Sequence, residues 1–266
     1  MDIVAMKECA QQARKKMIEL TFQTGKKGAH IAPSLSLTDI LTVLFSEEFV
    51  DGTDIFVLSK GHGALGYYCV LHALGKLPDD VIDTFDHDGG ILPGQPSKNE
   101  QLGIACSSGS LGMGLSYAVG QACAAKKMGK QTRVYVLVGD GELNEGSNWE
   151  AAMLARQLEL DNLTVIVDWN ELQSDGKTSN IISIDLEKLW DACGWRTQTV
   201  DGHDLGALVD AFQSRGSDAR PNVILAHTVK GKGVSFMEND PSWHHAALKQ
   251  KEYELALQEV LAGGSK

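Results

Sequence analysis

Two oxygen-bearing side chains follow two apolar runs in the middle of the chain. Asp140 stands in a Gly-Asp-Gly turn directly after residues 133–138, and Asn170 comes shortly after residues 163–167. Carboxylate and amide oxygens suit Mg²⁺, which usually takes one or two protein ligands and completes its shell with phosphate and water. Glycine lets a backbone approach a phosphate closely. This spacing therefore predicts a site for a metal ion and a diphosphate group.

Two other interpretations of the Gly-Asp-Gly turn have to be weighed. The tripeptide alone is more often just a turn, because all three residues are common in turns. The dinucleotide-binding fingerprint needs a third glycine, and Asn144 stands there instead. Asn170, at the end of the next apolar run, favours a binding site over a plain turn.

The elements that must position these residues form a strand–turn–helix–strand unit. The runs 133–138 and 163–167 are continuous, apolar and β-branched, which is typical of buried parallel strands. Their alternation with helical patterns predicts an α/β fold with a mainly parallel sheet and helices on both faces. Further strands are expected at 54–58, 196–200 and 221–226, and helices at 2–22, 37–49, 64–74, 108–128, 148–158, 186–193, 204–214 and 246–261.

Gly139-Asp140-Gly141 followed by Asn170 resembles the thiamin diphosphate signature, and the stretch from Gly139 to Ala152 resembles transketolases in particular. The resemblance runs from about His30 to about His245. It implies the thiamin diphosphate-binding fold, in the form of its diphosphate-binding (PP-type) domain. We therefore expect residues 1–266 to form a single domain, with the pyrimidine-binding and C-terminal domains on a partner chain.

Three of the eight histidines resemble active-site histidines of the family. A lone histidine is usually structural, but His30 lies in Gly-Ala-His, His62 in Ser-Lys-Gly-His and His244 in Ser-Trp-His. The resemblance implies that these three are catalytic, since imidazoles can relay protons near neutral pH. We assign no role to the others, which are His72, His87, His203, His227 and His245.

The resemblance also implies a cofactor site and a metal site. The metal, Mg²⁺ or alternatively Ca²⁺ or Mn²⁺, would be held by Asp140, Asn170 and the backbone carbonyl of Leu172. The residues implied to bind thiamin diphosphate are His62, Gly109, Ser110, Leu111, Gly139, Asp140, Gly141, Glu142, Asn170, Lys230 and His244.

One position departs from the family pattern. Transketolases generally carry a further histidine in a Gly-His-Pro segment, where this chain has Gln95 before Pro96. Glutamine can hydrogen-bond a hydroxyl but cannot take up or release a proton at neutral pH. The difference leaves the cofactor assignment intact and slightly favours an unusual acceptor.

Composition excludes several classes of partner. The 24 basic and 35 acidic residues give a net charge of −11, which argues against nucleic acid or an anionic membrane. No apolar run reaches the ~18 residues of a membrane span, and no signal peptide opens the chain. The five scattered cysteines are typical of reduced thiols in the cytoplasm.

The resemblance to transketolases implies the N-terminal half of a split, two-component transketolase. With its partner, such an enzyme would transfer a two-carbon ketol unit from a ketose phosphate donor to an acceptor, in a heterotetramer with two copies of each chain. One alternative acceptor is a carrier-protein or lipoyl thiol. The other alternative is a non-catalytic subunit that binds the cofactor for a structural or regulatory purpose.

Overall fold

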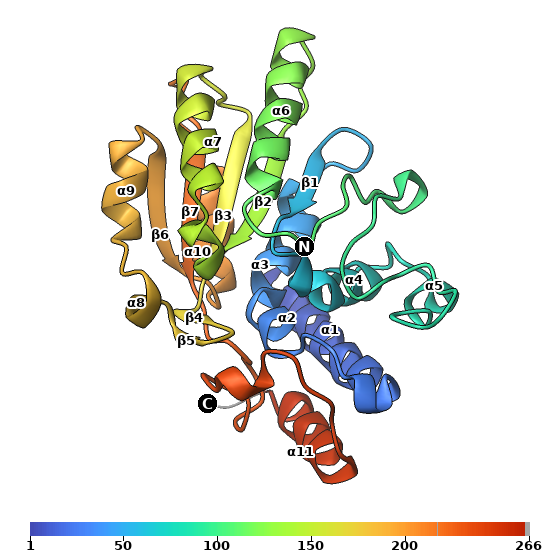
Figure 1. Ribbon diagram of the computed structural model, residues 1–266. Helices are drawn as coiled ribbons and strands as arrows, with labels where there is room; N and C mark the ends of the chain where they lie inside the picture. The colour runs from blue at the N-terminus through green and yellow to red at the C-terminus, as the bar shows by residue number, and fades with distance from the viewer. Residues whose placement is uncertain (217, 264–266) are drawn as a thin grey trace.

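A five-stranded sheet forms the centre of the protein (Figure 1). The computed structural model describes residues 1–216 and 218–263. All neighbouring strands are parallel, which confirms the predicted fold class. In spatial order the strands are β1 (Ile55–Leu58), β2 (Val134–Gly139), β3 (Leu163–Trp169), β7 (Asn222–His227) and β6 (Arg196–Asp201).

Helices cover both faces of this sheet, and β2 shows why a central strand can be apolar along its length. Val134, Val136 and Val138 belong to the core on one face, and Tyr135 and Leu137 belong to the core on the other. Successive strand side chains point to opposite faces, so a strand covered on both sides needs no polar residue. One core is covered by α6 (Gly114–Lys127), α7 (Gly146–Gln157) and α9 (Leu186–Ala192), and the other by α1 (Ile3–Gln23), α3 (Thr38–Val43), α4 (Ala64–Ala73) and α10 (Leu205–Gln213).

The connections leave a crevice at the carboxyl edge of the sheet. The chain passes from β1 into α4 on one face, but from the neighbouring β2 into α7 on the other face (Figure 1). Loops that leave adjacent strands in opposite directions open a crevice between them, where α/β sheets hold their ligands.

The remaining elements are short or lie near the end of the chain. The segment 171–183 contains the β4–β5 hairpin and α8. The last helix was expected from residue 246 but begins at Gln250, because Ala246 pairs with Ala29 in an antiparallel bridge. The elements are α2 (Ala32–Ser36), α5 (Asp79–Ile82), β4 (Leu172–Gln173), β5 (Gly176–Lys177), α8 (Thr178–Ile181) and α11 (Gln250–Leu261).

Across residues 1–216 and 218–263, each helix falls short of a membrane span in either length or apolar character.

Candidate active site

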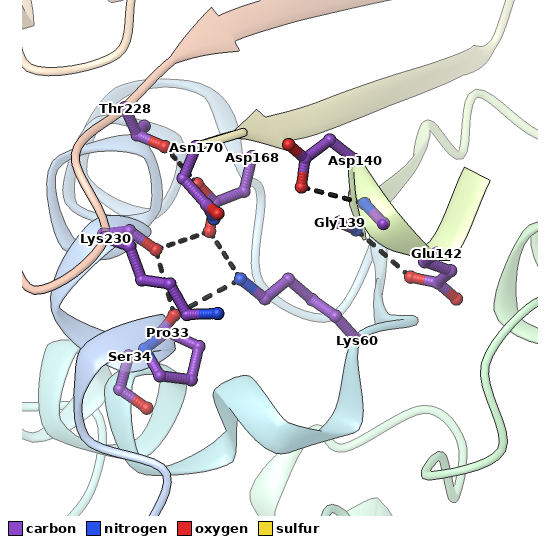
Figure 2. Close-up of polar contacts among 12 residues, drawn as sticks. Pro33, Ser34, Lys60, Gly139, Asp140, Glu142, Asp168, Asn170, Thr228 and Lys230 are labelled. Carbon is purple, nitrogen blue, oxygen red and sulfur yellow. Dashed lines mark hydrogen bonds and ion pairs between the residues drawn. The ribbon is translucent and has the colours of Figure 1, made fainter. Parts of the chain in front are cut away.

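Charged side chains gather where the parallel strands end. Lys60 follows β1, Asp140 follows β2, Asp168 lies near the end of β3, and Lys230 follows β7. Figure 2 shows Lys60, Asp168 and Thr228 turned toward one another, with Asp140 at the end of the neighbouring strand. The carboxyl edge therefore brings together residues that are far apart in the sequence.

Lys60 and Asp168 form a buried ion pair. Lys60 Nζ lies 2.5 Å from Asp168 Oδ2, and the two side chains are 1% and 0% exposed. Asp168 also accepts hydrogen bonds from the hydroxyls of Ser36 (2.6 Å) and Thr228. Lys60 Nζ donates a further bond to the carbonyl oxygen of Pro33, at 3.3 Å. These bonds satisfy the charges that burial would otherwise leave uncompensated.

Asp140 and Asn170 lie beside each other on adjacent strand ends, as predicted. The carboxylate of Asp140 accepts backbone N–H groups from Gly141 at 2.8 Å and Glu171 at 2.6 Å. Asn170 Oδ1 accepts the N–H of Leu172 at 3.1 Å. Burial, with the negative charge of Asp168 nearby, raises the pKa of Asp140 to about 7. A cation bound at this carboxylate would offset both effects.

Glu142 holds three loops together. Its carboxylate accepts hydrogen bonds from the Ser59 hydroxyl (2.5 Å) and from the backbone N–H groups of Gly112 (3.0 Å) and Gly139 (3.2 Å). Burial raises the pKa of this carboxyl. Glu142 therefore has a structural role, in which its hydrogen bonds fix the loops that follow β1 and β2.

A cavity of about 390 Å³ opens above these strand ends. Lys230 reaches into it and donates from Nζ to the carbonyl oxygen of Leu172 at 3.2 Å. Burial, aided by the like charge of Lys60, lowers the pKa of Lys230 to about 8. Gly109 and Ser110 lie outside the lining. The predicted residues that line the cavity are His62, Leu111, Gly139, Asp140, Gly141, Glu142, Asn170, Leu172, Lys230 and His244.

The three predicted catalytic histidines converge beside this cavity. The ring centroids lie 5.8 Å apart for His30 and His62, 5.3 Å for His30 and His244, and 5.2 Å for His62 and His244. A fourth ring, that of His245, lies 4.5 Å from His30. The chain thus brings segments from three separate regions of the sequence into one cluster.

Burial is the main cause that lowers the pKa of each predicted histidine. The pKa falls to about 4 for His30 and to about 3 for His244, and that of His62 falls well below its ordinary value. The positive charges of Lys60 and Lys230 contribute in all three cases. The three imidazoles are therefore neutral at pH 7.

A second, smaller cavity of about 190 Å³ adjoins the first, and His62 lines both. His30, Gln95 and His245 also line the smaller one. The Gln95 side chain lies against Gly109, where an added Cβ would come within 2.1 Å of Gln95 Oε1. Gln95 thus lies in the wall of the same cavity as His30, His62 and His245.

Three residues of this site were not assigned from the sequence. Lys60 and Asp168 carried a signal, because each is a charged residue at the end of an apolar strand run. His245 carried almost none, since only the residue before it, His244, matched the family pattern.

The fold and the site together define a diphosphate-binding α/β domain, and comparison with known proteins places it in a family. Residues 11–261 match the family model described as transketolase, thiamine diphosphate binding domain. The chain belongs to the transketolase family, and it corresponds to that thiamin diphosphate-binding domain.

This chain matches some relatives over almost their whole length and others over less than half of it. It is 43% identical over 260 residues to an apulose-4-phosphate transketolase subunit of Actinobacillus succinogenes, covering 94% of each chain. It is 36% identical over 267 residues to a 6-deoxy-6-sulfo-D-fructose transketolase subunit of a Clostridium species, covering 96% of each. The transketolase structure from Campylobacter jejuni matches with a TM-score of 0.90 and 28% identity, over 98% of this chain but 43% of that one.

The site fits the diphosphate of this cofactor. His244 Nδ1 is buried without a hydrogen-bond partner, so it has a donor or acceptor position free for a ligand. Lys60 and Lys230 place positive charge at the cavity that Asp140 lines. Among the described residues, no group of three or more histidine, cysteine, aspartate or glutamate side chains could hold a metal ion. A Mg²⁺ ion completed by diphosphate oxygens and water does not require such a group.

Proposed function

We propose that this chain is the N-terminal subunit of a two-component transketolase. With a partner subunit it would transfer a two-carbon ketol unit from a ketose phosphate donor to an acceptor. The observation that carries the proposal is the cavity at the strand ends, where Asp140, Asn170 and Lys230 meet the histidine cluster. Full-length similarity to proteins named as transketolase subunits supports the two-component form.

Thiamin diphosphate, when bound, supplies the electron sink for breaking and forming the carbon–carbon bond, and the protein orients the reactants around it. Asp140 and Asn170 would hold a Mg²⁺ ion, with the Leu172 carbonyl completing the protein ligands. Lys230 and His244 would face the diphosphate. His30, His62 and His244 are neutral at pH 7, so each can both donate and accept a hydrogen bond at substrate hydroxyls.

The partner would carry the pyrimidine-binding and C-terminal domains, while residues 1–266 form the single diphosphate-binding domain. We propose a heterotetramer with two copies of each chain. We also propose a cytoplasmic location, where the five cysteines, all unpaired in the structure, would stay reduced. The thiol acceptor on a carrier protein stays an alternative, which an acceptor assay tests directly.

Reconstitution tests the two-component form. The purified chain with thiamin diphosphate, Mg²⁺, a phosphorylated ketose and an aldehyde acceptor should show no turnover until the partner subunit is added. Robust turnover by the chain alone would refute the split enzyme.

Calorimetry of the complex tests the metal site. Asp140→Ala removes the one charged ligand, so the affinity for thiamin diphosphate in the presence of Mg²⁺ should collapse. Asp175→Ala, in the turn between β4 and β5, is a matched control that should bind normally. Near-normal affinity of Asp140→Ala would remove the metal assignment.

A further inference from the structure

His245 is held against His30 by the backbone. Ala29 and Ala246 exchange two hydrogen bonds, each of 3.0 Å, in an isolated antiparallel bridge. In an antiparallel pair the next residues along are directly opposite, with side chains on the same side and close together. Those residues are His30 and His245, and their rings meet edge to face at 4.5 Å and 79°.

Gly28 makes this bridge possible. Its φ is +68°, a conformation that favours glycine, and an added Cβ would lie 2.5 Å from the carbonyl carbon and oxygen of Ala246. The pairing of the two segments therefore depends on a close backbone contact. The backbone bridge therefore fixes the position of His245, although the side chain is exposed at the surface of this chain.

The smaller cavity offers groups that suit hydroxyls. His245, His30 and His62 line it together with the amide of Gln95 and the carboxylate of Asp86. Imidazole and amide groups can both donate and accept hydrogen bonds, as a hydroxyl does.

The same lining suits a phosphate poorly. None of the described residues that line this cavity is lysine or arginine. Lys27, the cation that pairs with Asp86 at 2.7 Å, lies outside the lining. Lys27 is already paired with Asp86, and no described lysine or arginine lines the cavity to bind a phosphate, so the cavity fits the uncharged, hydroxylated part of a sugar.

We propose that His245 is a specificity-determining residue that hydrogen-bonds a hydroxyl of the substrate carbons beyond the bond that breaks. The inference rests on the proposed ketol transfer and adds a residue and a subsite to it. His245 contacts the hydroxylated carbons of the sugar, while the phosphate of the same substrate lies outside this cavity.

Steady-state kinetics of the complex with its partner, thiamin diphosphate and Mg²⁺ test this role. The variants are His245→Ala and His245→Asn, with His87→Asn as a matched exposed histidine outside the cavity lining. The donors are a phosphorylated ketose that the complex uses and hydroxypyruvate. Beyond the breaking bond hydroxypyruvate has only a carboxylate, which leaves as CO₂, and no hydroxyl. In a ping-pong transfer, kcat/KM for the donor reports the donor half-reaction alone.

His245→Ala should lower kcat/KM for the ketose about 3- to 10-fold, mainly through KM, since one neutral hydrogen bond is lost. His245→Ala should change kcat/KM for hydroxypyruvate by no more than about twofold. His245→Asn keeps a hydrogen-bond donor and an acceptor, so it should recover most of the lost kcat/KM for the ketose. His87→Asn should change neither donor. Equal losses for both donors would indicate a merely structural role and overturn the proposal, as would no loss at all.

A binding measurement tests the contact at His245 independently of turnover. If the complex turns over no ketose, the proposed function fails, but this measurement still tests the role of His245. In the complex with ¹³C-labelled histidine, the His245 ring signal is the one that His245→Asn removes. Ribitol 5-phosphate should shift that signal saturably, and inorganic phosphate should not. A shift with phosphate alone, or none with ribitol 5-phosphate, overturns the assignment of His245.

Discussion

Replacing Asp168 by asparagine should destabilise the protein by roughly 3–5 kcal/mol, the range for breaking a buried ion pair from one side. The amide keeps the size of the side chain and can still meet the hydroxyls of Ser36 and Thr228. It removes the charge that lies 2.5 Å from Lys60 Nζ. The Lys60 ammonium then stays buried without a counter-ion, which is the dominant cost.

Urea unfolding followed by tryptophan fluorescence measures this loss, because Trp190 and Trp195 are both buried. The matched control is Asp161→Asn, which breaks the solvent-exposed pair between Lys126 and Asp161 at 2.8 Å. Exposed pairs contribute about 1 kcal/mol or less. If Asp168→Asn loses no more than this control, the role of Asp168 as the counter-ion of Lys60 is refuted.

The pH dependence gives a second check. Burial by itself raises the pKa of Asp168, but Lys60 and the hydrogen bonds from Ser36 and Thr228 outweigh it and hold the pKa below its ordinary value. A lowered pKa in the folded state stabilises above the unfolded-state pKa of about 4, and this contribution is lost as pH falls through the folded-state value. The stability difference between the wild type and Asp168→Asn should therefore shrink in acid.

Three further predictions concern other parts of the chain. Asp39→Asn should destabilise by about 3 kcal/mol at pH 7, because Arg14 loses its bidentate partner. Burial raises the pKa of Asp39, but Arg14 outweighs it and lowers the pKa to about 2. In urea titrations, the stability difference between the wild type and Asp39→Asn should therefore decrease as pH falls from ~4 to about 2. Gly28→Ala should lower stability by ~2 kcal/mol or more, against ~1 kcal/mol for Gly25→Ala, whose Cβ would meet open space; melting temperatures compare the two. Gln95→His should raise the exchange of xylulose 5-phosphate with ribose 5-phosphate up to ~10²-fold in steady-state assays, and ordinary transketolase rates in the native complex would contradict this.

The sheet could be predicted because its signal is local. The runs that became β2 and β3 are largely apolar, since two cores cover them, and the Gly-Asp-Gly turn marks where β2 ends. Asp140 is the first residue after β2, and Asn170 is the first residue after β3. A parallel sheet places the carboxyl ends of neighbouring strands together, so two local signals were enough to locate one site.

The rest of the site depends on contacts between distant segments. The bridge between Ala29 and Ala246 has no periodic pattern, so residue 246 was placed in a helix and His245 was given no role. The pairing of Lys60 with Asp168 likewise joins a residue just after β1 to one on β3, and β2 separates these strands in the sheet. Each residue is visible in the sequence, but which partner it meets is decided by the tertiary fold.

The bridge that aligns His30 with His245 also sets when the site can exist during synthesis. The strands and the Asp140 turn are all made before residue 245, so the diphosphate cavity can begin to form on a growing chain. The histidine cluster cannot be completed until the segment before α11 has left the ribosome and returned to Ala29. Contacts this distant along the chain close late and slowly. A chain that has not yet made residues 244 and 245 can therefore form the strand ends but not the complete cluster of histidine rings.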